Sequence, residues 1–173
     1  MKKLLIVVDY QKDFVDGSLG FDDAKKLDDY ISYLIDSYHK NNDDVLFTFD
    51  THHDNYLKTQ EGQHLPVVHC LENSEGWKLY GHVSEKIKPE DKCMYKPGFG
   101  SLELGNYLHD KSYQQITLVG IVSNICVISN ALLLRAALYN TTINVVEKAC
   151  AGVTKEKHLA ALETMRSCQI NVL

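Results

Sequence analysis

Short apolar runs rich in β-branched residues alternate with longer amphipathic stretches along this chain. This alternation is typical of a parallel sheet, whose strands are buried on both faces and joined by helices that cover them. The predicted strands are Leu4 to Val8, Val45 to Thr48, Ile116 to Val119, Ile143 to Val146 and Ile170 to Leu173, with a further short strand near Lys92 to Tyr95. We therefore expect an α/β fold of three layers, α/β/α, around a mostly parallel sheet of five or six strands.

The amphipathic stretches between these runs predict four helices. In the first, Asp22 to Lys40, apolar residues recur with a helical period after a suitable capping aspartate. The others are Ser101 to His109, Asn124 to Tyr139 and Lys155 to Ser167, the last beginning after Thr154, a suitable N-cap. The segment from Thr51 to Pro97 has weak periodicity and holds all three prolines, so we expect it to be largely loop.

Length and charge narrow the class of protein. A chain of 173 residues is of ordinary size for one domain, so residues 1–173 are expected to form a single domain. The net charge of −5, without long runs of one sign, does not indicate nucleic-acid binding. The apolar run at the N-terminus, Leu4 to Val8, is too short for a signal peptide or a membrane span. We expect a cytoplasmic protein with no membrane partner and with its five cysteines reduced.

Several chemically capable side chains stand where predicted strands end. Ligands of an open parallel sheet bind beyond the carboxyl ends of its strands. Asp9 follows the first strand, Asp50 and His52 the second, Lys96 the short strand, and Cys126 the strand before a tight turn at Gly120. Packing alone does not readily account for five such residues at one edge.

Cys126 is the candidate nucleophile. It is expected in the first turn of a helix, where the helix dipole and free N–H groups lower the pKa of a thiol and bind an oxyanion. Asp9 is the candidate base, and the Lys96 ammonium would favour both ionised groups. The alternatives are a buried structural cysteine, a turn aspartate and a solvated surface lysine, and the spacing leaves them open.

A second group, Asp50, His52 and His69, has the composition of a divalent metal site for zinc, iron or manganese. The Asp-x-His spacing directs both side chains to the same side of an extended segment. Glu61 and His64 lie between the two histidines in the sequence. A merely polar, solvated loop is the alternative. Nothing resembles a dinucleotide glycine fingerprint, so we expect no organic cofactor.

Five segments in one order resemble the isochorismatase-like cysteine hydrolases, and among these the nicotinamidases. They are VVDYQKDFVDG, FTFDTH, LPVVHC, YKPGFGS and VGIVSNICV. The resemblance implies a Rossmann-like sheet and an amidase that hydrolyses a small amide, most closely nicotinamide to nicotinate and ammonia, through a thioester on Cys126. It assigns Asp9 as base, Lys96 as supporting cation, and Asp50, His52 and His69 as metal ligands. It also implies a cis peptide bond between Ile121 and Val122 that orients the oxyanion-binding amides.

The resemblance places Phe14 in the substrate pocket, but three positions depart from the nicotinamidase pattern. Pro66 stands where an aromatic residue is common, and Asn73 and Ser74 replace the glycine and threonine that often follow the last metal histidine. We expect Trp77, Tyr95 or Phe99 to supply the missing ring of the pocket. The helix Asn124 to Tyr139 is apolar around much of its circumference, so we expect it in the core or at a subunit contact, and we expect a homo-oligomer.

Three other functions remain possible on the sequence evidence. The first is hydrolysis of another small amide, such as a ureido or carbamoyl compound. The second is a non-catalytic thiol sensor on the same fold, which would not need the Asp9 and Lys96 partners. The third is a vinyl ether hydrolase of the isochorismatase type, which is disfavoured because those enzymes lack a cysteine at the position of Cys126.

Overall fold

The computed structural model describes residues 1–173 and contains a single sheet of six parallel strands, in the order β3-β2-β1-β4-β5-β6. In chain order the strands are β1 (Leu4–Val8), β2 (Asp44–Asp50), β3 (Lys92–Lys96), β4 (Gln115–Ile121), β5 (Thr142–Ala151) and β6 (Asn171–Val172). All five strand pairings are parallel. The predicted α/β class and parallel sheet are confirmed.

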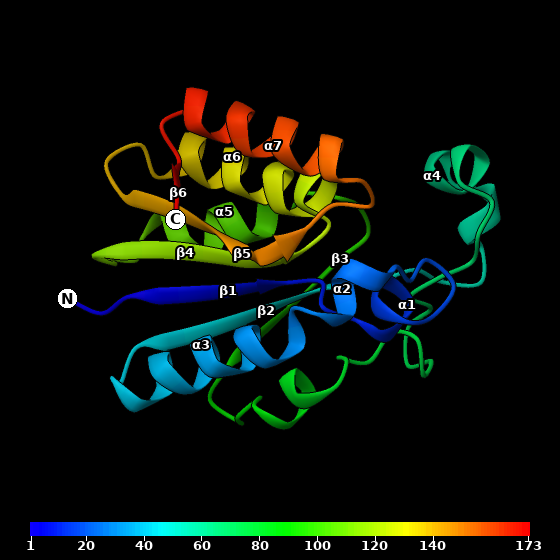
Figure 1. The fold of residues 1–173 in the computed structure, drawn as a ribbon, viewed down its shortest axis with the longest axis horizontal. Coiled ribbons are helices and arrows are strands. Elements are labelled where there is room, and N and C mark those ends of the chain that lie inside the picture. The colour runs from blue at the N-terminus through cyan, green and yellow to red at the C-terminus, as the bar shows by residue number, and fades with distance from the viewer.

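Helices cover both faces of this sheet (Figure 1). One face carries α5 (Leu102–His109), α6 (Ile128–Ala137) and α7 (Lys155–Ser167), and the other carries α1 (Lys12–Val15), α2 (Asp22–Lys25) and α3 (Asp28–Lys40). The short helix α4 (Gln60–His64) lies apart from both layers, at the end of the molecule to which the chain runs after β2. None of the helices combines the length and the apolar composition needed to cross a bilayer.

The central strand β1 shows why the sheet is buried on both sides. Successive side chains of a strand point to opposite faces. Accordingly Leu4, Ile6 and Val8 belong to the core under α5, α6 and α7. Leu5 and Val7 belong to the core under α3. Burial on both faces is what makes the run LLIVV continuously apolar.

The predicted helix Asp22 to Lys40 is wrong in one respect, because it is two helices. The helix α2 closes with a turn in which the Leu27 N–H donates to the Ala24 carbonyl at 3.3 Å, and α3 begins at Asp28. Leu27 is buried in the core at this break. The apolar period therefore continues across a change of helix, which is why periodicity alone does not detect the break.

The predicted tight turn at Gly120 is also wrong, because β4 continues through this residue to Ile121. Gly120 has a φ of +115°, and a Cβ atom there would lie 2.1 Å from the Val8 carbonyl oxygen. Glycine is therefore required where β4 passes β1, and the register of β4 against β5 shifts at the same point.

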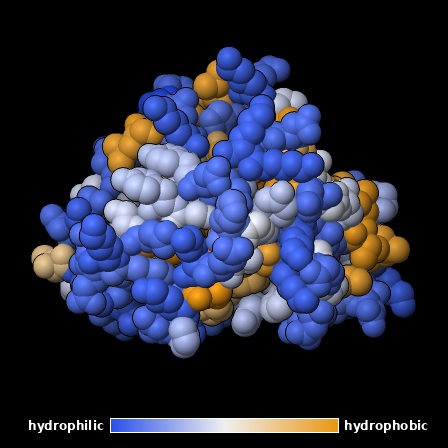
Figure 2. All heavy atoms as spheres, turned by 60° about the horizontal axis from the view of Figure 1, so that its bottom comes forward, coloured by the Kyte–Doolittle hydropathy of each residue, from blue (hydrophilic) through white to orange (hydrophobic).

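The predicted boundaries of α5 and α7 hold. Ser101 and Thr154 cap these two helices, each through a side-chain oxygen that accepts a backbone N–H of the first turn. The surface seen in Figure 2 is largely hydrophilic, with hydrophobic side chains in several separate patches, one of them towards the end where α4 lies. The segment around α4 contributes the exposed apolar residues Leu57, Leu65 and Val68.

Candidate active site

The carboxyl ends of β1, β2 and β3 bring three charged side chains together. Asp9 directly follows β1, Asp50 is the last residue of β2 and Lys96 is the last of β3. Asp50 and Lys96 are paired in the register of their strands. All three side chains are buried. The parallel sheet therefore gathers residues that lie up to 87 positions apart, from Asp9 to Lys96, at a single edge.

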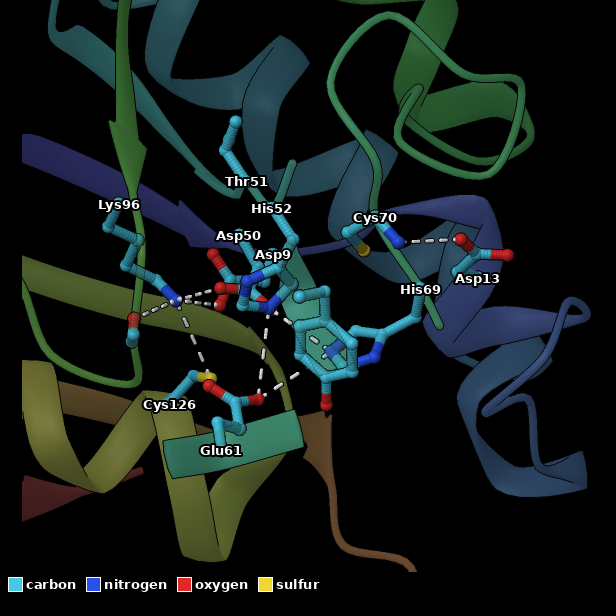
Figure 3. Close-up of polar contacts among 12 residues, drawn as sticks. Asp9, Asp13, Asp50, Thr51, His52, Glu61, His69, Cys70, Lys96 and Cys126 are labelled. Carbon is cyan, nitrogen blue, oxygen red and sulfur yellow. Dashed lines mark hydrogen bonds and ion pairs between the residues drawn. The ribbon is translucent and has the colours of Figure 1, made fainter. Parts of the chain in front are cut away.

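Lys96 is the centre of this group (Figure 3). Its Nζ lies 2.6 Å from Oδ2 of Asp9 and 3.6 Å from Oδ1 of Asp50. It also donates to the Gly98 carbonyl at 2.8 Å and lies 3.6 Å from Sγ of Cys126. The other oxygen of Asp9 accepts the Thr48 hydroxyl at 2.7 Å. The cation is thus surrounded by two carboxylates, a carbonyl and the thiol.

The environment shifts the pKa values of this group in ways that suit proton transfer. Burial raises the pKa of Asp9, and the Lys96 ammonium opposes that rise only in part. Burial alone would lower the pKa of Lys96, but the Asp9 carboxylate, together with that of Asp50, outweighs burial, so the pKa is raised. Asp9 is therefore a stronger base than a solvated aspartate, beside a lysine that stays charged.

Cys126 lies in a turn of π-helix, Ser123–Val127, between β4 and α6. The Ile121–Val122 peptide bond just before this turn is cis. The carbonyl of Val122 accepts the N–H groups of Ile125 and Val127 at 3.0 and 3.2 Å. These bonds place the thiol under the carboxyl ends of the strands, facing Lys96 (Figure 3).

The expectation that the helix lowers the pKa of the Cys126 thiol is wrong. Burial raises this pKa well above the ordinary thiol value, and the Asp9 carboxylate raises it further, whereas Lys96 lowers it. The Cys126 side chain is buried, so desolvation of the thiolate outweighs the effect of the short helical turn. Cys126 therefore rests as a thiol, and a base is needed to remove its proton.

A second cluster adjoins the first, made by Asp50, His52, Glu61 and His69. Oδ2 of Asp50 lies 3.1 Å from Nε2 of His52 and 3.4 Å from Nε2 of His69. Oε1 of Glu61 lies 3.8 Å from the first of these nitrogens and 3.7 Å from the second. Burial would raise the pKa of Asp50, but its bonds with the two imidazoles outweigh burial, so the pKa is lowered.

The geometry of this cluster fits a divalent metal ion. A tetrahedral ion about 2.1 Å from each ligand separates neighbouring ligand atoms by about 3.4 Å, and the four distances here run from 3.1 to 3.8 Å. Nδ1 of His69 contacts the Val67 carbonyl at 2.7 Å, which leaves Nε2 to face the other donors. Glu61 joins the three predicted ligands, whereas His64 contacts the carbonyl of Gln60 and lies outside the cluster.

A cavity of about 280 Å³ opens beside both clusters. Its polar residues include Asp50, Glu61 and His69, and Cys126 also lines it. Its apolar wall is formed by Phe14, Leu19, Leu65, Phe99, Val122, Ile125 and Val153. The Phe14 ring also packs against His69, with ring centroids 5.4 Å apart. The cavity is therefore apolar over most of its wall and reactive at one side.

Trp77 and Tyr95 do not line this cavity, so the expectation that they do is wrong. Their rings stack on one another with centroids 5.5 Å apart, and both pack against Phe49. Tyr95 precedes Lys96 on β3, so the two side chains point in opposite directions. Of the three aromatic residues expected to complete the pocket, only Phe99 lines the cavity.

The sequence did not indicate several residues of the cavity wall. Leu19, Leu65, Ile125 and Val153 lie in four separate segments and are ordinary apolar residues. Thr48 lies inside β2, where the sequence indicates only a strand residue, although its hydroxyl donates to Asp9. No spacing marks such residues, because their roles depend on contacts between distant segments.

The fold and the grouped side chains define the class: an α/β protein with a candidate hydrolase site at the carboxyl edge of a parallel sheet. More particularly, the chain belongs to the isochorismatase family, whose isochorismatase domain matches residues 3–173.

Named relatives cover almost the whole chain. PncA of Bacillus subtilis (strain 168), described as an uncharacterised isochorismatase family protein, is 28% identical over 175 residues, covering 94% of this chain and 93% of that protein. The nicotinamidase/pyrazinamidase of Mycobacterium tuberculosis is 26% identical over 192 residues, covering 99% and 98%. A crystal structure of nicotinamidase/pyrazinamidase PncA from Bacillus subtilis matches with a TM-score of 0.89 at 27% identity, over 99% of both chains.

A pyrazinamidase of Pyrococcus horikoshii, solved in complex with zinc, shares the fold with a TM-score of 0.86 at 22% identity, over 100% of this chain and 99% of that one. Together these findings confirm the resemblance to nicotinamidase-like members of the isochorismatase family. They also support the prediction of a hydrolase that acts on C–N bonds.

Proposed function

We propose that this protein is a cysteine amidohydrolase that converts a small aromatic amide, nicotinamide in the first place, into its carboxylic acid and ammonia. The observation that carries the proposal is the meeting of Asp9, Lys96 and Cys126 at one side of an apolar cavity. A buried thiol with a raised pKa needs a base, and the structure provides an aspartate made more basic by burial. Similarity to nicotinamidases supports the choice of substrate.

In the first half of the reaction, Asp9 removes the proton of the Cys126 thiol as sulfur attacks the amide carbon. A C–S bond forms, and the backbone amides of Val122 and Cys126 receive the negative oxygen. Asp9 then returns the proton to the leaving nitrogen, the C–N bond breaks and ammonia departs. Lys96 stays charged and stabilises the negative charge that passes between sulfur and carboxylate.

In the second half, water hydrolyses the thioester that remains on Cys126. Asp9, ionised again, takes a proton from a water molecule while the water oxygen adds to the acyl carbon. The C–S bond breaks, the carboxylic acid is released, and the proton on Asp9 restores the thiol. Asp9 thus acts as base and acid in turn, and burial, which raises its pKa, makes its carboxylate the stronger base that this exchange needs.

Asp50, His52 and His69, with Glu61, would hold a divalent metal ion, with zinc expected and iron or manganese as alternatives. Bound there, the ion would supply a Lewis-acidic contact for the ring nitrogen of a pyridine or pyrazine amide. The protein residues around it define the rest of the pocket. Phe14 and Phe99 provide apolar walls for a flat ring, and the cavity volume suits a single small ring rather than a larger substrate.

The test is ammonia release from nicotinamide by the purified, zinc-loaded protein. We expect release by the wild type, loss of release in Cys126→Ala, and unchanged release in Cys168→Ala, since Cys168 is exposed and outside the site. Full activity of Cys126→Ala would contradict the mechanism. No release by folded, zinc-loaded wild type would contradict nicotinamide as substrate and direct the search to other small amides.

A further inference from the structure

Asp13 is a charged residue of α1 that takes no part in the chemistry proposed above. Its Oδ2 accepts the backbone N–H of Cys70 at 2.7 Å, across 57 positions of sequence (Figure 3). Its own backbone N–H donates to the Gly76 carbonyl at 2.9 Å. Asp13 is therefore bonded twice to the segment that follows the metal-ligand candidate His69.

Cys70, whose N–H Asp13 accepts, is hydrogen-bonded to the segment just after β2 that carries the other histidine, His52. Its carbonyl accepts the His52 N–H at 2.9 Å, and the His52 carbonyl accepts the Glu72 N–H at 2.8 Å. Cys70 has a φ of +45°, a backbone conformation that residues other than glycine rarely adopt. The position of this residue relative to His69 and His52 therefore depends on these bonds.

The space around the Asp13 carboxylate shows that the contact is closely packed. A Cβ atom on Gly76 would lie 2.1 Å from Oδ2 of Asp13, and one on Gly17 would lie 2.5 Å from Oδ1. Two glycines thus leave room for the carboxylate on either side. The ring of Phe14, the next residue of α1, packs on the His69 ring. Helix α1 therefore contacts both His69, a candidate metal ligand, and Cys70, the residue after it.

From these contacts we infer that Asp13 is a positioning residue for the metal centre. By accepting the N–H of Cys70, Asp13 fixes the position of the backbone that carries His69. It thereby also fixes the distance between this backbone and His52. The inference rests on the metal site of the proposed function. Hydrogen-bond geometry is the essential property of Asp13, rather than its negative charge, since its carboxylate contacts backbone groups and none of the metal-ligand atoms.

The experiment measures zinc affinity by competition with a chromophoric chelator, and the visible spectrum after substitution with cobalt(II). Loss of a residue that orients metal ligands typically weakens binding roughly 10- to 100-fold. We expect that weakening and an altered cobalt spectrum for Asp13→Ala. Asp13→Asn keeps an oxygen acceptor and should retain affinity within about threefold of the wild type by the same principle. Asp16→Ala, an exposed aspartate just after α1, is the matched control and should bind like wild type.

A second variant perturbs the same contact from the other side. Gly76→Ala leaves Asp13 in the sequence but pushes its carboxylate away, so zinc affinity should fall as it does in Asp13→Ala. Wild-type affinity in both variants would overturn the inference. Equal weakening by Asp13→Asn and Asp13→Ala would also overturn it, because charge would then be the essential property. If the wild-type protein binds no zinc, both the metal site and this inference are overturned. The proposed amidase activity is tested separately, by ammonia release.

Discussion

The Lys96 ammonium and the Asp9 carboxylate form a fully buried ion pair, 2.6 Å apart, at the carboxyl edge of the sheet. The pair joins the proposed base to the only cation within contact distance of Cys126. Removing one member of a buried pair leaves the other as an uncompensated buried charge, whereas removing both does not. This relationship separates the contribution of the two residues to stability from their contribution to activity.

Lys96→Met is expected to lower the free energy of unfolding by about 3–5 kcal/mol, because Asp9 remains buried without its partner. The double variant Asp9→Asn, Lys96→Met should regain most of that stability while staying inactive. Urea unfolding with chelator present, so that bound metal does not contribute, measures both effects. Equal instability of the single and double variants would show that the pair does not have this energetic role.

His69→Ala is expected to abolish stoichiometric zinc binding, since its Nε2 faces Asp50 and Glu61. His64→Ala is the matched control, five positions earlier, because that imidazole is exposed and contacts only the carbonyl of Gln60. Metal analysis of protein dialysed against buffered zinc measures the content of each variant. Similar zinc contents in the two variants would place the metal elsewhere.

Phe99→Ala is expected to raise KM for nicotinamide roughly 5- to 10-fold with a smaller change in kcat, because it removes part of the apolar wall of the cavity. Tyr95→Ala is the matched control, since this exposed ring stacks on Trp77 away from the cavity. Steady-state kinetics of both variants decide between the two aromatic residues. A larger rise in KM for Tyr95→Ala than for Phe99→Ala would instead place Tyr95 in the substrate pocket.

Alkylation of Cys126 in the resting enzyme is expected to be slow at neutral pH and still to be accelerating above pH 9. Burial raises the pKa of this thiol, so the reactive thiolate is the minor form below that pKa and its fraction keeps growing as the pH rises. Mass spectrometry of the peptide containing Cys126 after timed exposure to iodoacetamide gives the rate at each pH. A rate that levels off near neutral pH would indicate a thiolate in the resting state.

Much of the fold was accessible to sequence analysis because it depends on local pattern. Continuous apolar runs such as Leu4–Val8 mark strands buried on both faces, and Thr154 marks the start of α7 at the observed residue. Where a tertiary contact overrides the pattern, the prediction failed. The break at Leu27 and the passage of β4 through Gly120 depend on core packing and on the nearby Val8 carbonyl.

The sequence by itself determined which residues the site contains. It placed Asp9, Asp50 and Lys96 at the ends of strands and a cysteine after β4. The tertiary structure alone decided how these groups affect one another. Enclosure of Cys126 raises the pKa of a thiol that its helical position was expected to lower, and strand alternation sends Tyr95 away from the cavity while Phe99 enters its wall. The physical reason is that desolvation, ion pairing and cavity shape depend on distances between segments far apart in the chain, which residue types and spacing do not contain.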